Sequence, residues 1–163
     1  MGRTLIVSLL LLAVAAFADD AKPNFSGTWK LNAAKSDFGP MPAPDSRTDT
    51  IDHKEPVVKE SISMSSSQGD MQWDITYTTD GKDSKNTVMG SDMVSNAHWD
   101  GKTLVSDSKA NFGGSDMTIH GTIAISDDGK ILTRQAHFSG PMGEGDQKLV
   151  FDKQDKQDKQ ESK

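Results

Sequence analysis

Apolar and polar residues alternate along most of this chain, and the alternation is clearest in the stretch 25–31. Every second residue there is apolar or glycine, while serine, threonine and lysine fill the other positions. A period of two is typical of a strand that buries one face. The stretch therefore predicts a first β-strand in which Gly27 and Trp29 form a structural motif on the inner face.

The same alternation predicts nine further strands, separated by short turn sequences. Three of these turns read Asp-Gly-Lys, at 80–82, 100–102 and 128–130, and Asp-Gly supplies the positive φ angles of tight hairpins. Because a closed meander has no unpaired edges, we expect an all-β fold, an antiparallel up-and-down β-barrel or clam of about 8 to 10 strands. The expected strands are 48–54, 57–65, 71–79, 85–90, 93–100, 103–112, 116–126, 131–139 and 147–153.

The segment that follows the first strand departs from this pattern. Asn32 to Ser36 predicts a helical turn with Asn32 as its N-cap. Prolines at 40, 42 and 44 then forbid regular structure, because each proline lacks an N–H donor and has a fixed φ. We expect this connection to lie across the surface or over one mouth of the barrel.

Both ends of the chain read as segments outside the domain. Residues 1–18 combine an early arginine, a thirteen-residue apolar run and Ala16-Phe17-Ala18, which is the pattern of a signal peptide cleaved near Ala18. A polar leader at 19–24 precedes the barrel domain at 25–153. The tail at 154–163 has no apolar residue and is predicted to be disordered. We therefore expect a secreted or periplasmic protein with no stable membrane anchor.

Charge and cysteine content argue against one class of partner and one source of stability. The chain has a formal net charge of −6, and the charges are mixed along it, which argues against a nucleic-acid partner because such partners require clustered lysine and arginine. The absence of cysteine excludes disulfides, so that stability must come from a core. We expect a monomer.

Two groups of residues resemble the calycin superfamily, which contains the lipocalins and the fatty-acid-binding proteins. The stretch 25–31 is similar to their N-terminal Gly-x-Trp strand, and Trp99 with Asp100-Gly101-Lys102 resembles a hairpin of the fatty-acid-binding branch. The likeness is closest to small exported bacterial lipocalin-like proteins. It implies a barrel that binds a small hydrophobic or amphipathic molecule and needs no cofactor.

The sequence departs from the calycin pattern at several positions. The proline-rich segment stands where fatty-acid-binding proteins have a helical lid, and the last strand lacks their carboxylate-binding arginine. Arg134 is the only candidate for the arginine that lipocalins pack over the conserved tryptophan. Three interpretations of Arg134 remain open: an outward surface ion pair, a contact with a ligand head group, or a cap on Trp29.

The sequence gives only weak support for a catalytic site or a metal site. The four histidines, at 53, 98, 120 and 137, fall on four different strands without a short ligand spacing, and we expect surface or core histidines rather than a metal site. No nucleophile elbow, phosphate loop or dinucleotide fingerprint occurs. Glu60 and Asp107 are the only carboxylates that suggest an acid/base pair, for an isomerase or hydrolase, and we expect no enzyme.

The inward-facing positions supply the candidate binding site. The eight methionines include Met71, Met89, Met93, Met117 and Met142, which either line an adaptable cavity or fill the core. The leading hypothesis is a small-molecule-binding barrel, and the alternative is a ligand-free structural or interaction module of the cell envelope. The candidate contact residues are Met64, Trp73, Ile75, Tyr77, Met93, Trp99, Ile119 and Arg134.

Overall fold

A computed structural model describes residues 22–141 and 143–155, and these residues form one ten-stranded antiparallel sheet. The predicted signal peptide, residues 19–21 of the predicted leader and residues 156–163 of the predicted tail lie outside the described residues. The strands are β1 (Gly27–Leu31), β2 (Ser46–Lys54), β3 (Val57–Ser66), β4 (Gly69–Thr78), β5 (Ser84–Val88), β6 (Ser91–Asp100), β7 (Thr103–Phe112), β8 (Ser115–Ile125), β9 (Ile131–Gly140) and β10 (Gly143–Gln154).

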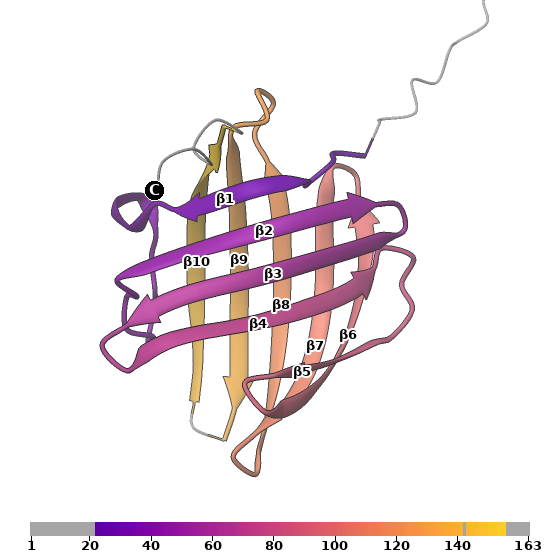
Figure 1. Ribbon diagram of the computed structural model, residues 1–163. Helices are drawn as coiled ribbons and strands as arrows, with labels where there is room; N and C mark the ends of the chain where they lie inside the picture. The colour runs from indigo at the N-terminus through magenta and orange to yellow at the C-terminus, as the bar shows by residue number, and fades with distance from the viewer. Residues whose placement is uncertain (1–21, 142, 156–163) are drawn as a thin grey trace, which may run out of the picture.

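The sheet folds over itself into two layers (Figure 1). Strands β1 to β4 cross in front of β6 to β10, which run in a different direction behind them. The first strand joins the layers, because β1 pairs with β2 on one side and with β10 on the other. The predicted all-β, antiparallel barrel or clam is confirmed, and all ten predicted strands are present with ends that differ by only a few residues.

The core lies between the two layers, on the faces that the alternation predicts. Phe25, Trp29, Leu104, Leu132 and Phe151 are fully buried there. The predicted helical turn is also confirmed, as a short 3₁₀ helix η1 (Ala33–Lys35) in which the side chain of Asn32 accepts a hydrogen bond from the Lys35 N–H.

The proline-rich connection begins alongside β10. Backbone hydrogen bonds join Asp37 to Lys148 in both directions, and the Asn32 N–H donates to the Val150 carbonyl at 2.8 Å. These bonds occupy the edge of β10 beyond the point where β1 ends. The segment therefore extends the pairing of β1, and a helical lid is not found among these residues.

One predicted hairpin is wrong. Asp80-Gly81-Lys82 does not join two paired strands, because β4 and β5 lie at opposite ends of the sheet order and share no backbone ladder among the described residues. The Gly81 N–H instead donates to the Ala97 carbonyl on β6. The chain bends at Gly81, but no backbone ladder joins β4 and β5 on the two sides of the bend.

Side chains bridge the gap between β4 and β5. The Thr76 N–H donates to Asn86 Oδ1 at 2.8 Å, and Asn86 Nδ2 donates to the Thr76 carbonyl at 3.0 Å. The Thr78 N–H donates to Ser84 Oγ at 3.2 Å. The Asn86 amide thus takes the place of a backbone peptide of a neighbouring strand.

Replacing Asn86 by alanine is expected to open this gap locally. The change removes both hydrogen bonds to Thr76, at a cost of about 1–2 kcal/mol, and we expect the Thr76 amide to exchange its hydrogen at least about tenfold faster than in the parent protein. Hydrogen exchange followed by NMR measures this rate. Thr87→Ala, one residue further on the opposite face of β5, is the control, and an unchanged Thr76 rate in Asn86→Ala would contradict the bridge.

One end of the barrel is closed by stacked rings. The rings of Phe25 and His53, and those of Phe25 and Trp99, have centroids 5.4 Å apart. Trp29 lies beneath them with 0% exposure, and its Nε1–H donates to the Phe25 carbonyl at 2.9 Å. The ammonium group of Lys153 lies 5.1 Å from the centroid of the Trp29 ring.

The carboxylate of Glu55 joins the residues of this closed end by hydrogen bonds. It accepts hydrogen bonds from Thr79 Oγ1 at 2.5 Å and from Trp99 Nε1 at 2.8 Å. His53 Nδ1 accepts from the Phe25 N–H, so its Nε2 carries the proton and donates to Glu55 at 3.1 Å. Although partial burial acts to raise the pKa of Glu55, these three hydrogen bonds hold it below its ordinary value.

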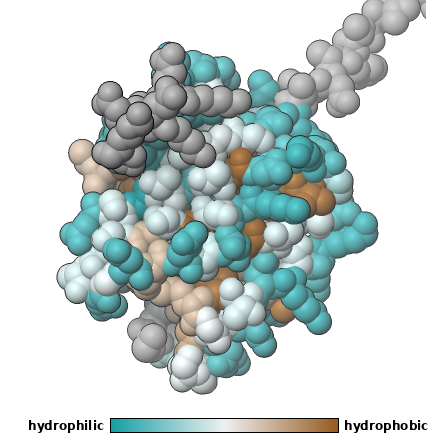
Figure 2. Space-filling model, in the orientation of Figure 1, coloured by the Kyte–Doolittle hydropathy of each residue, from teal (hydrophilic) through white to brown (hydrophobic). Residues whose placement is uncertain are grey.

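The outer faces of the strands are predominantly polar. Figure 2 shows hydrophilic and neutral residues over most of the β1–β4 side, with small, separated apolar patches. Met89, in the turn after β5, is the most exposed large apolar side chain of the described residues, at 58%. Among the helices of the described residues, none is long and apolar enough to cross a membrane.

Candidate functional site

The barrel interior contains a cluster of four charged side chains. Arg47 on β2 donates from Nε and Nη2 to the two carboxylate oxygens of Asp49, at 2.8 and 3.0 Å. Arg134 on β9 reaches across from the other layer, donates to Glu60 on β3, and places Nε 3.6 Å from Asp49 Oδ2. Both carboxylates are fully buried and both arginines are nearly so, with 15% and 16% side-chain exposure.

The period of two explains how these four residues meet. Ile51 and Ile62 point into the core, so Asp49 and Arg47 lie two and four residues before one isoleucine, and Glu60 lies two before the other, all on the inner face. The register places Asp49 opposite Ile62 and Ile51 opposite Glu60. The two carboxylates are therefore diagonal neighbours on adjacent strands.

The two buried carboxyl groups differ in acidity. Burial acts to raise the pKa of Asp49, but the charges of Arg47 and Arg134 and the Arg47 hydrogen bonds hold it below the ordinary value. Complete burial raises the pKa of Glu60; Arg134 opposes the shift, while the negative charge of Asp49 adds to it. Asp49 is thus the more acidic member, and Glu60 is the one that takes up a proton first.

A cavity of about 100 Å³ adjoins this cluster. Its apolar wall includes Ile75, Met93, Leu104 and Ile123, and its polar wall is formed by serines, Asn86, Tyr77 and Arg134. None of the rings that close the other end of the barrel borders it. The cavity therefore lies away from Trp29, on the side of the charged cluster.

Three buried polar atoms at the cluster have no hydrogen-bond partner among the described residues. They are Glu60 Oε2, the Tyr77 hydroxyl oxygen and Arg134 Nε. Burial and the nearby charge of Glu60 also raise the pKa of the Tyr77 phenol, so that its hydroxyl keeps its proton. An unpaired donor or acceptor in a low-dielectric interior costs roughly 1–3 kcal/mol, and a guest with a polar group can recover that energy.

The structure brings together half of the contact residues expected from the sequence. Ile75, Tyr77, Met93 and Arg134 border the cavity beside the charged cluster. Trp99 belongs instead to the ring stack of the closed end. The remaining three, Met64, Trp73 and Ile119, do not border the cavity.

The candidate methionines that the structure describes also lie in different environments. Met93 borders the cavity, Met71 and Met117 are half-buried on inward positions, and Met89 is exposed in a turn. Met89 therefore neither lines a cavity nor fills the core. Met142 lies outside the described residues.

The interpretation of Arg134 as an outward, surface-paired residue is wrong, because its side chain is buried against Glu60 and Asp49. It does not cap Trp29 either, since the cation over that ring is Lys153. Sequence reasoning also missed Arg47 and Asp49. The sequence does contain a signal for them, because both lie an even number of residues before the apolar Ile51 and therefore share its face of the strand.

Glu60 and Asp107 do not share a site. Glu60 is buried inside the barrel, whereas the Asp107 side chain is 59% exposed on the outer face of β7. The wall of the barrel separates the two carboxylates, and they cannot act together on one substrate as an acid/base pair.

Comparisons with known proteins agree with this geometry. No protein-family model matches the sequence, and no curated protein sequence matches it significantly. Among solved structures, human cRBP IV, a cellular retinol-binding protein, superposes with a TM-score of 0.52 over 81% of this chain and 99% of its own, at 15% identity. This likeness shows the fold, a nearly closed ten-stranded antiparallel barrel.

Two further solved structures resemble this barrel. Secretory abundant heat soluble protein 4 from Ramazzottius varieornatus has a TM-score of 0.49 and 12% identity, covering 80% of this chain and 95% of its own. Zebrafish ileal bile acid-binding protein, solved with cholic acid, has a TM-score of 0.49 and 15% identity, covering 80% and 98%.

Proposed function

We propose that this protein is an exported, non-enzymatic carrier that binds a small, uncharged amphipathic molecule through a hydroxyl group. The observation that supports this is an apolar cavity wall that also contains Tyr77 and Arg134, each with an unpaired polar atom. A third unpaired atom, Glu60 Oε2, lies in the adjoining charged cluster. A hydroxyl group both donates and accepts. In this proposal it accepts from Arg134 or Tyr77, which line the cavity, and donates to Glu60 Oε2 in the adjoining cluster. A purely apolar guest can do neither.

The charge of the cluster favours a neutral guest over an acid. Two arginines already face two carboxylates, and these formal charges cancel. A ligand carboxylate would bring a third negative charge beside Glu60, where burial makes repulsion costly. Human cRBP IV, which has this fold, is named for binding retinol, an alcohol.

The cavity volume limits the size of the guest in the present arrangement. Ligand pockets for drug-sized molecules span about 300–1,000 Å³, whereas an apolar cavity of about 150 Å³ accepts benzene. With about 100 Å³ available, a larger guest requires Met93 or other lining side chains to move. Methionine is suited to such movement because its side chain is unbranched and flexible.

Export and the monomeric state are further parts of the proposal. The apolar run within residues 1–18 supports export. The absence of a cysteine that could carry a lipid anchor supports a protein that is free in the periplasm or outside the cell. Detection of a mature chain that begins at Asp19 in the periplasmic or culture fraction, by mass spectrometry, tests this part separately.

Matched alcohol and acid pairs test the ligand chemistry. 1-Propanol against propanoate probes the cavity in its present size, and retinol against retinoate probes an expanded one. We expect the alcohol to bind at least about tenfold more tightly than the acid in a pair that binds, because the acid leaves a buried charge unbalanced. Titrations followed by NMR for the small pair and by fluorescence for the large pair measure the affinities.

Tyr77→Phe should weaken binding of the alcohol by roughly five- to tenfold, the effect of one lost hydrogen bond. Thr78→Val, which removes a hydroxyl from the outer face of the same strand, is the control and should change nothing. Tighter binding of the acids would contradict the hydroxyl assignment. No binding by either pair would favour the ligand-free envelope module instead.

A further inference from the structure

Four chemically reactive side chains form a row across the outer face of the back layer. The register places Asp107 on β7 opposite His120 on β8, His120 opposite His137 on β9, and His137 opposite Asp146 on β10. Directly opposed residues on antiparallel strands have Cβ atoms about 4.5–5.5 Å apart. The two histidines are therefore immediate neighbours, with one carboxylate on either side.

Hydrogen bonds orient both imidazole rings. His120 Nδ1 lies 2.8 Å from Asp107 Oδ1, and His137 Nδ1 lies 2.8 Å from Asp146 Oδ1. An ionised carboxylate only accepts hydrogen bonds, so each Nδ1 carries the proton and each Nε2 keeps a free lone pair. Because the two aspartates lie on opposite sides of the pair, the ring edges that carry Nε2 face one another.

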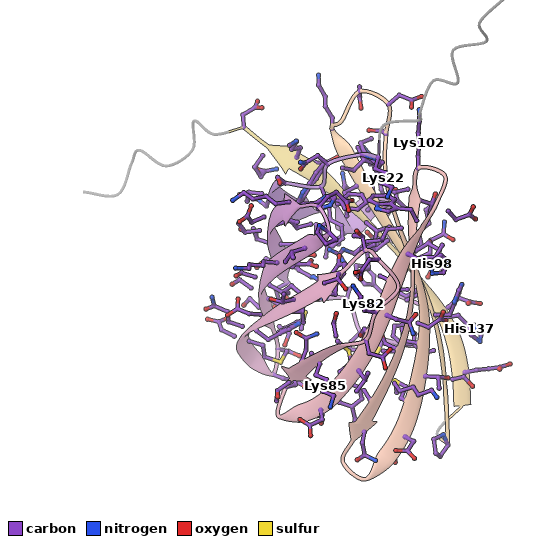
Figure 3. All side chains as sticks on the ribbon, turned by 90° about the vertical axis from the view of Figure 1, so that its right-hand side faces the viewer. Lys22, Lys82, Lys85, His98, Lys102 and His137 are labelled. Atoms are coloured by element: carbon purple, nitrogen blue, oxygen red, sulfur yellow. The ribbon has the colours of Figure 1, made fainter. Side chains whose placement is uncertain are left out.

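Both rings are accessible from solvent. The side chains of His120 and His137 are 57% and 45% exposed. Two surface hollows, of about 550 and 430 Å³, meet at the pair, since both imidazoles line both hollows. In the side view of Figure 3, His137 and His98 lie on the outer side of this layer, away from the front strands.

We propose that His120 and His137 form a two-histidine binding site for a divalent transition-metal ion such as Zn²⁺. Two Nε2 atoms would ligate the ion, and water would fill its remaining positions. Imidazole is a preferred ligand of zinc, copper and nickel. The site lies on the outside of the barrel and is independent of the interior cavity.

The flanking aspartates have a second role in such a site. A ligating histidine commonly donates its other N–H to a carboxylate, which fixes the tautomer and makes the ligand more basic, and both histidines already have this arrangement. Among residues 22–141 and 143–155, no set of three or more histidine, aspartate or glutamate side chains is arranged to hold a metal. The aspartates accordingly position the rings, and the histidines alone bind the ion.

Zinc titration of the purified protein tests the site. We expect isothermal calorimetry to show one saturable Zn²⁺ per chain and no comparable binding of Mg²⁺, which prefers oxygen ligands. His120→Ala and His137→Ala should each weaken Zn²⁺ binding at least tenfold. Asp107→Asn should weaken it about tenfold through loss of ring positioning, and ¹⁵N NMR should show the Nε2 resonances shifting on binding.

His98→Ala is the matched control, because His98 is an exposed histidine on the same layer. It should leave Zn²⁺ affinity unchanged. The proposal is overturned if the parent protein shows no saturable Zn²⁺ binding, if either His120→Ala or His137→Ala binds as tightly as the parent, or if His98→Ala loses as much affinity as they do. Unchanged thermal melting of the variants excludes a folding defect as the cause.

Discussion

Replacing Arg134 by methionine is expected to destabilise the protein by about 3–5 kcal/mol at neutral pH, the usual cost of leaving a buried charge uncompensated. The variant keeps Asp49 and Glu60 in the interior but leaves Arg47 as their only counter-charge. Methionine preserves much of the side-chain volume, so the loss comes from electrostatics rather than from a cavity. Urea denaturation followed by tryptophan fluorescence measures the change.

A second substitution should recover much of this loss. Arg134→Met combined with Glu60→Leu removes one charge of each sign and leaves the Arg47–Asp49 pair intact. Replacing a buried ion pair by apolar side chains is often neutral or stabilising. A double variant no more stable than Arg134→Met would contradict the account of the cluster.

The deficit of Arg134→Met should also depend on pH. In the folded protein the pKa of Glu60 is raised above 4.5, and Arg134 is the group that limits the rise. Without Arg134, the pKa of Glu60 in the folded protein rises further. Folded Glu60 then keeps its proton at pH values where Glu60 of the unfolded chain has lost it. The folded state then binds more protons than the unfolded state, so stability falls as pH rises above 4.5. The loss should be smaller at pH 5 than at pH 8.

Trp29→Ala is expected to cost about 3–5 kcal/mol, as is usual for a large aromatic side chain removed from a core. Trp29 is fully buried beneath the stacked rings and also donates a hydrogen bond to Phe25. Its loss leaves a cavity at the closed end and removes the aromatic face on which Lys153 rests. Urea denaturation again supplies the measurement.

Two variants separate the contributions at this position. Trp29→Phe keeps a ring but loses the hydrogen bond, and should cost clearly less than Trp29→Ala. The matched control, Trp73→Ala, makes the same change at a half-buried tryptophan, and should cost less than half as much. Equal losses at positions 29 and 73 would show that the closed end has no special part in stability.

The alternation of side chains was enough to predict the strands, because each strand buries one face and the buried positions recur every second residue. The stretch Trp73, Ile75 and Tyr77 shows this directly, since each alternates with an exposed residue. The prediction of a hairpin was wrong at Asp80-Gly81-Lys82, although the local sequence is typical of one. The separation of β4 from β5 depends on where the ten-stranded sheet begins and ends, which no short segment contains.

The candidate site was predicted less completely, for a different reason. Glu60 and Arg134 were recognised separately, but a pairing between β3 and β9 joins residues 74 positions apart. Such a contact follows only from the closure of the two layers. The histidine pair was likewise hidden, because His120 and His137 become neighbours only through the register of β8 and β9.

The bridge made by Asn86 also affects how much of the backbone at the two ends of the sheet is open to another strand. A sheet whose first and last strands are unpaired presents two rows of backbone groups that could recruit a strand from another chain. Here the Thr76 N–H and carbonyl and the Thr78 N–H are already engaged by Asn86 and Ser84. The side chains that join the two edges thereby keep this backbone unavailable for self-association.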